Sequence, residues 1–338
     1  MTQGEYKEID LAKMVAAIMV VAIHAQPFSG LTEAMLIDVW ARLAVPFFFI
    51  ASAFFFFKKP AGQQHIGHYV KRLALLYLLW FVVELPITVL HFYIEPQRSI
   101  GQSTLALLQG LLWGSTFSGS WFITALMECI PLVWLLGRRL SSATLLLAGC
   151  ALYAVVVGST YYYTVLPSDW RSWVDACHAW SFKPELSWAS AFVFCVAGRL
   201  MAEKEAQVKA IGSRKMLWAW LFALTVAAGE VLTMFFVARP QSTDVYFALL
   251  PFAILSFMLV LNLRCPWKFD YLRLRRYSTL FYFSHFIFVF ILVLVNKHLL
   301  PVNPLLKYGL VLLLCWLLAT TMLTLSQRRG FRWLKYGF

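Results

Sequence analysis

Two ionisable residues in the first apolar segment have types and a spacing suited to chemistry. Lys13 and His24 are eleven residues apart, about three turns of an α-helix, so both lie on nearly the same helix face and differ in height by about 16 Å. A lysine ammonium holds anions, and histidine is suited to acid–base catalysis. Asp10 lies one turn before Lys13 and is placed to pair with it. The alternative is that Lys13 extends to lipid headgroups and His24 lies at the membrane interface.

A second group of candidates surrounds the next apolar segment. Arg42 precedes Pro46, and Ser52 follows on the same segment. Proline has no backbone N–H, which leaves a carbonyl open to a ligand. Downstream, Lys71 and Arg72 are placed to hold phosphates. The alternatives are a proline-kinked helix with an interfacial arginine, and ordinary anchoring by cytoplasmic cations.

A third group lies in two later apolar segments. Ser278, Tyr282 and His285 occupy positions i, i+4 and i+7 and share one helix face. Glu128 lies inside a segment that Trp121 opens, and an ionisable side chain in a bilayer is a functional candidate because it is costly there. The alternatives are hydrogen bonds that only pack the helices, a tryptophan anchor and a protonated glutamic acid bonded between helices.

The composition indicates which elements must position these residues. Of the 338 residues, 61% are apolar and 13% are charged, whereas a soluble domain carries roughly 25% charged residues. This excludes a disordered chain, a collagen and a disulfide-stapled secreted scaffold, and it indicates an all-α polytopic membrane protein. A span needs about 20 mostly apolar residues. The sequence predicts about ten transmembrane helices, over residues 10–28, 39–57, 73–94, 121–137, 143–162, 186–202, 216–238, 245–263, 277–296 and 304–325.

The distribution of basic residues predicts the orientation. With the N-terminus inside, 22 of the 29 Lys and Arg residues fall in inner segments and six in outer segments, which favours both termini in the cytoplasm. The net charge of +13 is then assigned to contact with anionic membrane lipids and not to nucleic acid. We expect residues 1–338 to form a single transmembrane domain. The His and Cys residues lack the close spacing of a metal site.

Taken together, these motifs resemble the acyltransferase-3 family of integral membrane acyltransferases. The family's patterns are a basic residue followed after ten positions by histidine, an arginine before a Val-Pro-Phe-Phe-Phe run, a Trp-Phe pair and Ser-x-x-x-Tyr-x-x-His. They fall here on Asp10, Lys13, His24, Arg42 to Phe54, Trp121, Phe122, Ser278, Tyr282 and His285. The first two spans are particularly similar to the membrane part of the vancomycin-resistance serine/alanine racemases.

Three positions depart from the family's pattern. Lys13 stands where an arginine is usual, and lysine lacks the planar fork of the guanidinium. Ala53 replaces the glycine of a Ser-Gly-Phe motif. The basic cluster after the second span is Lys71 followed directly by Arg72, and not Arg-x-x-Arg. The departures at Lys13 and at Lys71-Arg72 affect the residues that, by the resemblance, bind the coenzyme A donor.

The resemblance implies a membrane O-acyltransferase of the bacterial inner membrane. It would move an acyl group, acetyl above all, from cytosolic acetyl-CoA to a hydroxyl of an envelope glycan or a related acceptor. His24 is implied as the general base or transient acyl carrier, and Arg42 as the residue that orients substrate or stabilises charge on the carbonyl oxygen. Lys13 is implied as a third catalytic residue. The resemblance also implies that Lys13, Lys71 and Arg72 hold the coenzyme A phosphates. The cavity would be lined by Asp10, Ser52, Trp121, Glu128, Ser278, Tyr282 and His285.

Two other functions use the same residues. A transporter or flippase for a small amino acid such as serine would place the charges along a transport pathway, and a non-catalytic scaffold would not depend on them. The enzyme interpretation requires Lys13 and His24 to point into one common, water-accessible cavity.

Overall fold

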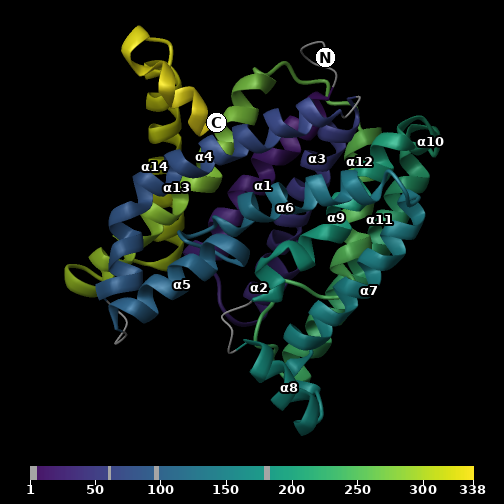
Figure 1. Ribbon diagram of the computed structural model, residues 1–338, viewed down its shortest axis with the longest axis horizontal. Coiled ribbons are helices and arrows are strands. Elements are labelled where there is room, and N and C mark those ends of the chain that lie inside the picture. Colours follow the sequence, from purple (N-terminus) through teal and green to yellow (C-terminus); the bar gives the residue numbers. More distant parts are fainter. Residues whose placement is uncertain (1–5, 60–61, 95–98, 179–182) are drawn as a thin grey trace.

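The computed structural model describes residues 6–59, 62–94, 99–178 and 183–338, which form helices and the loops between them (Figure 1). The α-helices are α1 Lys7–Ala25, α2 Gly30–Glu33, α3 Ala44–Phe57, α4 Gln63–Val89, α5 Ile100–Trp113, α6 Trp121–Leu136, α7 Ser142–Thr160, α8 Ser168–His178, α9 Trp188–Glu203, α10 Glu205–Ala210, α11 Ser213–Val237, α12 Leu249–Asn262, α13 Tyr271–His298 and α14 Pro304–Leu325. Short π- or 3₁₀-helical segments cover Ala34–Trp40, Ala41–Leu43, Leu90–Ile94, Tyr163–Val165, Pro184–Leu186 and Arg329–Gly337.

Each of the ten predicted spans coincides with a helix, so the all-helical prediction is confirmed. In the part of the chain that the structure describes, six helical stretches are long and apolar enough to cross a membrane, namely Gly30–Phe57, Gln63–Val89, Ser142–Thr160, Ser213–Val237, Tyr271–His298 and Pro304–Leu325. The chain is therefore a multi-pass membrane protein. Helices α6, α9 and α12 are shorter, and α1 carries several charges in its first two turns. The count of ten and the cytoplasmic position of both termini stay predictions.

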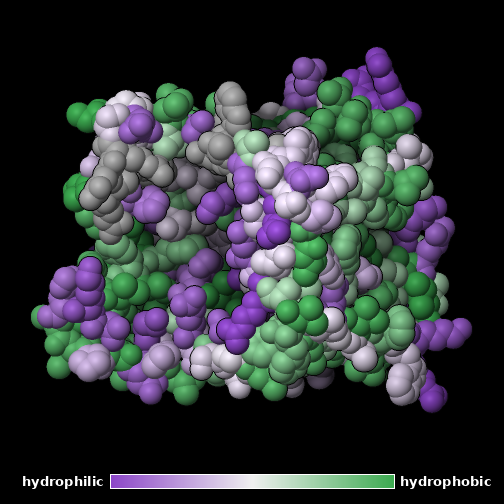
Figure 2. Space-filling model, turned by 90° about the horizontal axis from the view of Figure 1, so that it is seen from below, coloured by the Kyte–Doolittle hydropathy of each residue, from purple (hydrophilic) through white to green (hydrophobic). Residues whose placement is uncertain are grey.

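Apolar side chains are abundant on the outside of the molecule. Leu147, Phe222 and Phe236 have exposed fractions of 72–74%, and Figure 2 shows hydrophobic residues covering much of the face that it presents. A soluble monomer rarely exposes apolar surface on this scale. Lipid chains cover such a surface without cost, in agreement with the membrane location.

The second predicted span is irregular where its sequence contains proline. A π-helical turn over Ala34–Trp40 and a 3₁₀ turn over Ala41–Leu43 lead into α3. Pro46 lies in the first turn of α3 and donates no hydrogen bond to the carbonyl of Arg42, so the backbone before it is free to change its helix type. Arg42 is thereby carried on a tight 3₁₀ turn rather than on a regular helix.

Ionic contacts define two opposite ends of the helix bundle. At one, which we call the Asp10 end, Arg275 at the start of α13 pairs with Asp10 of α1, and Lys58 after α3 pairs with Glu205. At the other, the Arg42 end, Arg42 pairs with Asp244, which precedes α12. Helix α1 runs from the first end to the second and packs along α13, α3 and α14 (Figure 1). It can therefore present one face to both ends.

Small residues bring α3 and α9 close together in the centre of the bundle. A Cβ at Gly198 would lie 2.4 Å from the Ile50 carbonyl oxygen and 2.7 Å from the Ala53 side chain. Close approach through small residues is a common way to pack helices in membranes. At the position where the family has glycine, Ala53 is therefore accommodated because the facing residue is itself a glycine. This contact fixes the helix that carries Ser52 and Phe48.

Candidate active site

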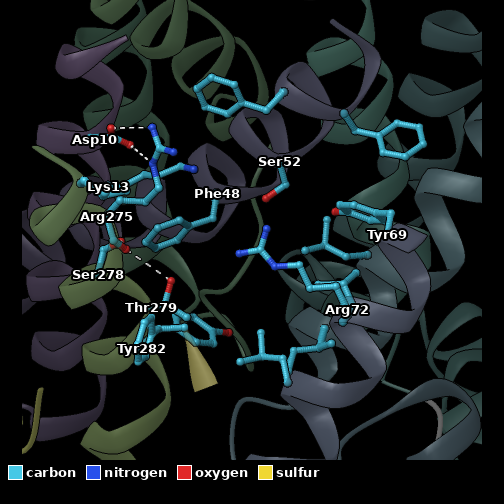
Figure 3. Close-up of a pocket in the computed structure, with 18 of the residues that line it drawn as sticks. Asp10, Lys13, Phe48, Ser52, Tyr69, Arg72, Arg275, Ser278, Thr279 and Tyr282 are labelled. Atoms are coloured by element: carbon cyan, nitrogen blue, oxygen red, sulfur yellow. Dashed lines mark hydrogen bonds and ion pairs between the residues drawn. The ribbon is translucent and has the colours of Figure 1, made fainter. Parts of the chain in front are cut away.

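A cavity of about 900 Å³ opens among α1, α3, α4, α6 and α13 (Figure 3). It extends from the Asp10 end toward Tyr282 on α13. Aromatic residues form much of its wall, and polar and charged residues from four helices face into it. Among the described residues its lining includes Asp10, Lys13, Phe48, Ser52, Phe55, Tyr69, Arg72, Phe122, Arg275, Ser278, Thr279 and Tyr282.

Four Lys and Arg residues line this cavity, namely Lys13, Lys59, Arg72 and Arg275, and among the described residues only Arg275 has an ion-pair partner. The guanidinium of Arg275 donates two hydrogen bonds of 2.7 Å to the carboxylate of Asp10, which is 3% exposed. Lys13 lies 5.0 Å from the centre of the Phe55 ring. Within the described residues, neither the Lys13 ammonium nor the Arg72 guanidinium has a hydrogen-bond or salt-bridge partner. Figure 3 shows them approaching the cavity from opposite walls.

Two unpaired cations facing a cavity are an unusual arrangement in a membrane protein. Lys13 is only partly exposed, and a charge away from bulk water is costly unless an opposite charge compensates it. Arg72 is more exposed but faces the same cavity. Both Lys13 and Arg72 are therefore suited to hold an anionic ligand, and phosphate oxygens form strong charge-assisted hydrogen bonds with such groups.

Helix α13 supplies more of the polar lining than any other helix. Asp270 caps its N-terminus by accepting a hydrogen bond of 2.9 Å from the Arg273 amide, which sets the start of the helix. Arg275, Ser278 and Tyr282 then follow at positions that face α1. Ser278 Oγ donates to the Arg275 carbonyl at 2.8 Å. Tyr282 donates to the Gly119 carbonyl at 3.3 Å and stacks edge-on to Phe48 and beside Phe122, so these three rings close the far end of the cavity.

His24 does not line this cavity, and the expectation that Lys13 and His24 share one chamber is wrong for the described structure. Helix α1 ends just beyond His24 because Gln26 adopts a left-handed conformation (φ 49°) and Pro27 cannot continue the helix. His24 is exposed at the Arg42 end. Its ring centre lies 5.2 Å from that of His285, which in turn lies 6.2 Å from that of Tyr282. Both residues lie on the same regular helix, but the α13 residues His285 and Tyr282 lie between His24 and the cavity.

Arg42 is also separate from the cavity that contains Lys13. It forms an ion pair with Asp244, donates to Thr243 Oγ1 at 2.9 Å and lies 3.9 Å from Asp38. These contacts border a second pocket of about 30 Å³. Arg42 therefore holds the loop before α12 and does not reach a ligand bound near Lys13.

The same small pocket contains Trp121 and Glu185. Burial raises the pKa of Glu185, and the neighbouring carboxylate of Asp244 adds to this effect. Trp121 thus belongs to the Arg42 end, whereas the next residue, Phe122, lines the large cavity. The predicted Trp-Phe pair is divided between the two sites because successive helix residues point about 100° apart.

Three further predicted residues lie outside the cavity lining, namely Lys71, Glu128 and the fully buried His285. Lys71 is exposed, and only its neighbour Arg72 turns inward. Glu128 is partly buried on α6 and is not part of the lining. Sequence reasoning missed Arg275, which was counted only as an inner cation. A signal was available, because Arg275 precedes Ser278 by three residues and so shares its helix face.

Comparison with known proteins identifies the family of the chain. The family described as an acyltransferase domain, acyltransferase-3, matches residues 6–322. The chain belongs to this family. It is 25% identical over 342 residues to an amino-acid racemase of Enterococcus faecalis, an alignment that covers 95% of this chain and 46% of that protein. It is also 27% identical over 169 residues to a serine/alanine racemase of Enterococcus gallinarum, which covers 47% of this chain and 24% of that protein.

The acyltransferase-3 chain thus spans less than half the length of the curated relatives that it matches. Their racemase names describe those longer proteins. No solved structure matches the chain. Membership in the family shows membrane acyl transfer in general and leaves the donor and the acceptor to be inferred from the site.

Proposed function

We propose that this acyltransferase takes an acyl group, acetyl above all, from cytosolic acyl-CoA and transfers it to a hydroxyl of an envelope glycan or a related acceptor. The observation that carries the proposal is the pair of unpaired cations, Lys13 and Arg72, on opposite walls of the cavity at the Asp10 end. Coenzyme A is polyanionic, and the cavity provides two positive groups for its phosphates. The positive-inside distribution of charges supports placing this end in the cytoplasm.

The acceptor is expected to arrive at the opposite end, where His24 is exposed. In the proposed reaction His24 removes the proton from the acceptor hydroxyl, whose oxygen attacks the thioester carbonyl. The carbon–sulfur bond breaks, and the proton passes to the leaving thiolate of coenzyme A. The described structure does not join Lys13 and His24 in one cavity, which the enzyme interpretation required. Tyr282 and His285 lie between the cavity and His24, so the proposal includes a movement in which the side chains that close the far end separate and the two substrates meet.

Reconstituted protein tests the proposal directly. Purified protein in liposomes is given acetyl-CoA labelled in the acetyl group, and transfer to isolated envelope glycan is measured as ester that mild alkali releases. We expect transfer by the wild type, none by His24→Ala, and normal transfer by Lys71→Ala, whose side chain points away from the cavity. Equal transfer by wild type and His24→Ala would exclude the proposed role of His24.

A second candidate function is movement of a small amino acid such as serine across the membrane. The alignment of 95% of this chain with part of an amino-acid racemase favours it, because buried charges also mark transport pathways. Liposomes separate the two functions. Uptake of labelled serine without any acetyl transfer would support the transporter and refute the enzyme.

A further inference from the structure

The hydrogen bonding of His285 specifies which of its nitrogens carries a proton. His285 lies on α13 with none of its surface exposed, and its Nδ1 is 3.0 Å from the Phe281 carbonyl oxygen. A carbonyl oxygen only accepts, so Nδ1 must donate to it. In the neutral ring Nε2 is then a hydrogen-bond acceptor. This Nε2 is buried and has no hydrogen-bond partner among the described residues.

The polar neighbour of this unsatisfied acceptor is His24. The two ring centres are 5.2 Å apart, and the planes are tilted by 36°. His24 belongs to the last turn of α1 and is exposed, so its ring has room to rotate about the side-chain torsions. A rotation that turns one His24 nitrogen toward Nε2 brings the two nitrogens near hydrogen-bond distance.

Phe286 packs against both histidine rings. Its ring lies 4.3 Å from the His24 ring and 4.0 Å from the His285 ring, centre to centre. Gly119 packs closely against the Phe286 ring, since a Cβ at this position would lie 2.5 Å from the ring. Gly119 also has φ 77°, a conformation that favours glycine. Phe286 is held in this position beside the fully buried His285 ring, so the exposed His24 is a candidate partner for Nε2 within the protein.

We propose that His285 is a positioning residue for His24. His285 Nε2 accepts a hydrogen bond from one N–H of His24, which fixes His24 in a single tautomer and turns the lone pair of its other nitrogen toward the exposed side. His285 itself gains and loses no proton: the acceptor's proton passes to the free nitrogen of His24 and from there to the departing thiolate. The arrangement follows the general logic by which a third group orients a catalytic base. This inference rests on the proposed function of His24.

Two substitutions at His285 separate its two nitrogens. In His285→Asn the amide nitrogen replaces Nδ1 and retains the donor to the Phe281 carbonyl, but no acceptor remains at the Nε2 position. In His285→Gln the longer side chain returns an amide oxygen near that position and loses the anchor. We expect His285→Asn to lower kcat for acyl transfer by about 10- to 100-fold with KM for acyl-CoA within about twofold, and His285→Gln to recover part of the loss. An unchanged kcat in His285→Asn would overturn the inference.

The tautomer of His24 is measured without reference to activity. In detergent-solubilised protein with nitrogen-15-labelled histidine, the His24 signals are assigned by their loss in His24→Ala. We expect one protonated and one unprotonated nitrogen in the wild type, and a mixture of tautomers in His285→Asn. A tautomer mixture in the wild type, or no change in His285→Asn, would refute the inference even if every variant transfers acyl groups. If the wild type transfers none, the proposed function fails, and the spectrum still decides whether His285 orients His24.

Discussion

The cavity at the Asp10 end and the pocket at the Arg42 end contain similar residues but differ in how their charges are satisfied. The first has a volume of about 900 Å³, and among the described residues three of its lining cations, Lys13, Lys59 and Arg72, lack an ion-pair partner. The second has about 30 Å³, and its one cation, Arg42, is held by Asp244, Thr243 and Asp38. A paired charge stabilises the protein itself, whereas an unpaired one is available to a ligand. From this difference we propose that Lys13 and Arg72 bind substrate and that Arg42 stabilises the fold.

Removing the charge of Lys13 is expected to have the largest effect on KM for acyl-CoA. Lys13→Met keeps the length of the side chain and removes the ammonium, so we expect KM for acyl-CoA to rise about 10- to 100-fold, corresponding to the about 1.5–3 kcal/mol of a hydrogen bond to a charged group. Stability should stay the same or rise, since an unpaired charge leaves the membrane region. Steady-state kinetics over a range of acyl-CoA concentrations measure the effect.

The matched control for Lys13→Met is Lys13→Arg, which has the residue usual in the family at this position. It retains the charge, and we expect KM within about threefold of the wild type. A KM in Lys13→Met equal to that of the wild type would mean that the unpaired ammonium does not contact the donor.

The opposite result is expected at the Arg42 end. Arg42→Met leaves Asp38 and Asp244 facing one another and the half-buried Glu185, so we expect a loss of about 1–3 kcal/mol in stability and no change in KM for acyl-CoA. Thermal unfolding in detergent follows the loss. Adding Asp244→Asn should restore part of it because one of the repelling charges is removed. A large rise in KM with unchanged stability would contradict this assignment, because Arg42 would then bind substrate and would not stabilise the fold.

The sequence predicted the helices well and the charge pairing poorly, for a physical reason. Hydropathy reports which segments lie in the membrane, and it located a helix at each of the ten positions. The spacing of Lys13 and His24 predicted a common helix face correctly. Which residues of other helices lie against that face depends on tertiary packing, so neither the position of Tyr282 and His285 between the cavity and His24 nor the Asp244 partner of Arg42 was visible in the sequence. Arg275 was missed for the same reason, because its partner Asp10 is 265 residues away.

Two adjacent residues on α4 give a smaller and more local test. Arg72 lines the cavity and Lys71 does not, although the sequence assigned both to phosphate binding. We expect Arg72→Ala to raise KM for acyl-CoA about tenfold, a smaller effect than at Lys13 because Arg72 is more exposed to solvent. Lys71→Ala should change KM less than twofold. Equal effects of the two substitutions would indicate that general positive charge attracts the donor and that the cavity geometry does not matter.

Glu205 lies at the Asp10 end, as Lys13 and Arg72 do, but its charge is paired. It therefore tests whether a charge at this end binds substrate because of its position or because it lacks a partner. It accepts hydrogen bonds from Lys58, Lys209 and Tyr6. Burial alone would raise the pKa of Glu205, but the hydrogen bonds from Lys209 and Lys58 outweigh it and the pKa is lowered from 4.5. A carboxyl with a lowered pKa in the folded state stabilises the protein above the unfolded pKa, and this contribution is lost as the pH falls through the folded value.

We therefore expect Glu205→Gln to lower stability at neutral pH by about 1 kcal/mol or less, since the pairs lie near the surface. The stability difference from the wild type should shrink as the pH falls below 4.5, and KM for acyl-CoA should not change at any pH. Thermal unfolding between neutral and acid pH measures the difference. If Glu205→Gln instead alters KM, a paired charge at the Asp10 end would also affect donor binding. The lack of a partner would then not distinguish Lys13 and Arg72 as substrate-binding residues. If only stability changes, pairing separates the charges that hold the fold from those that hold the substrate.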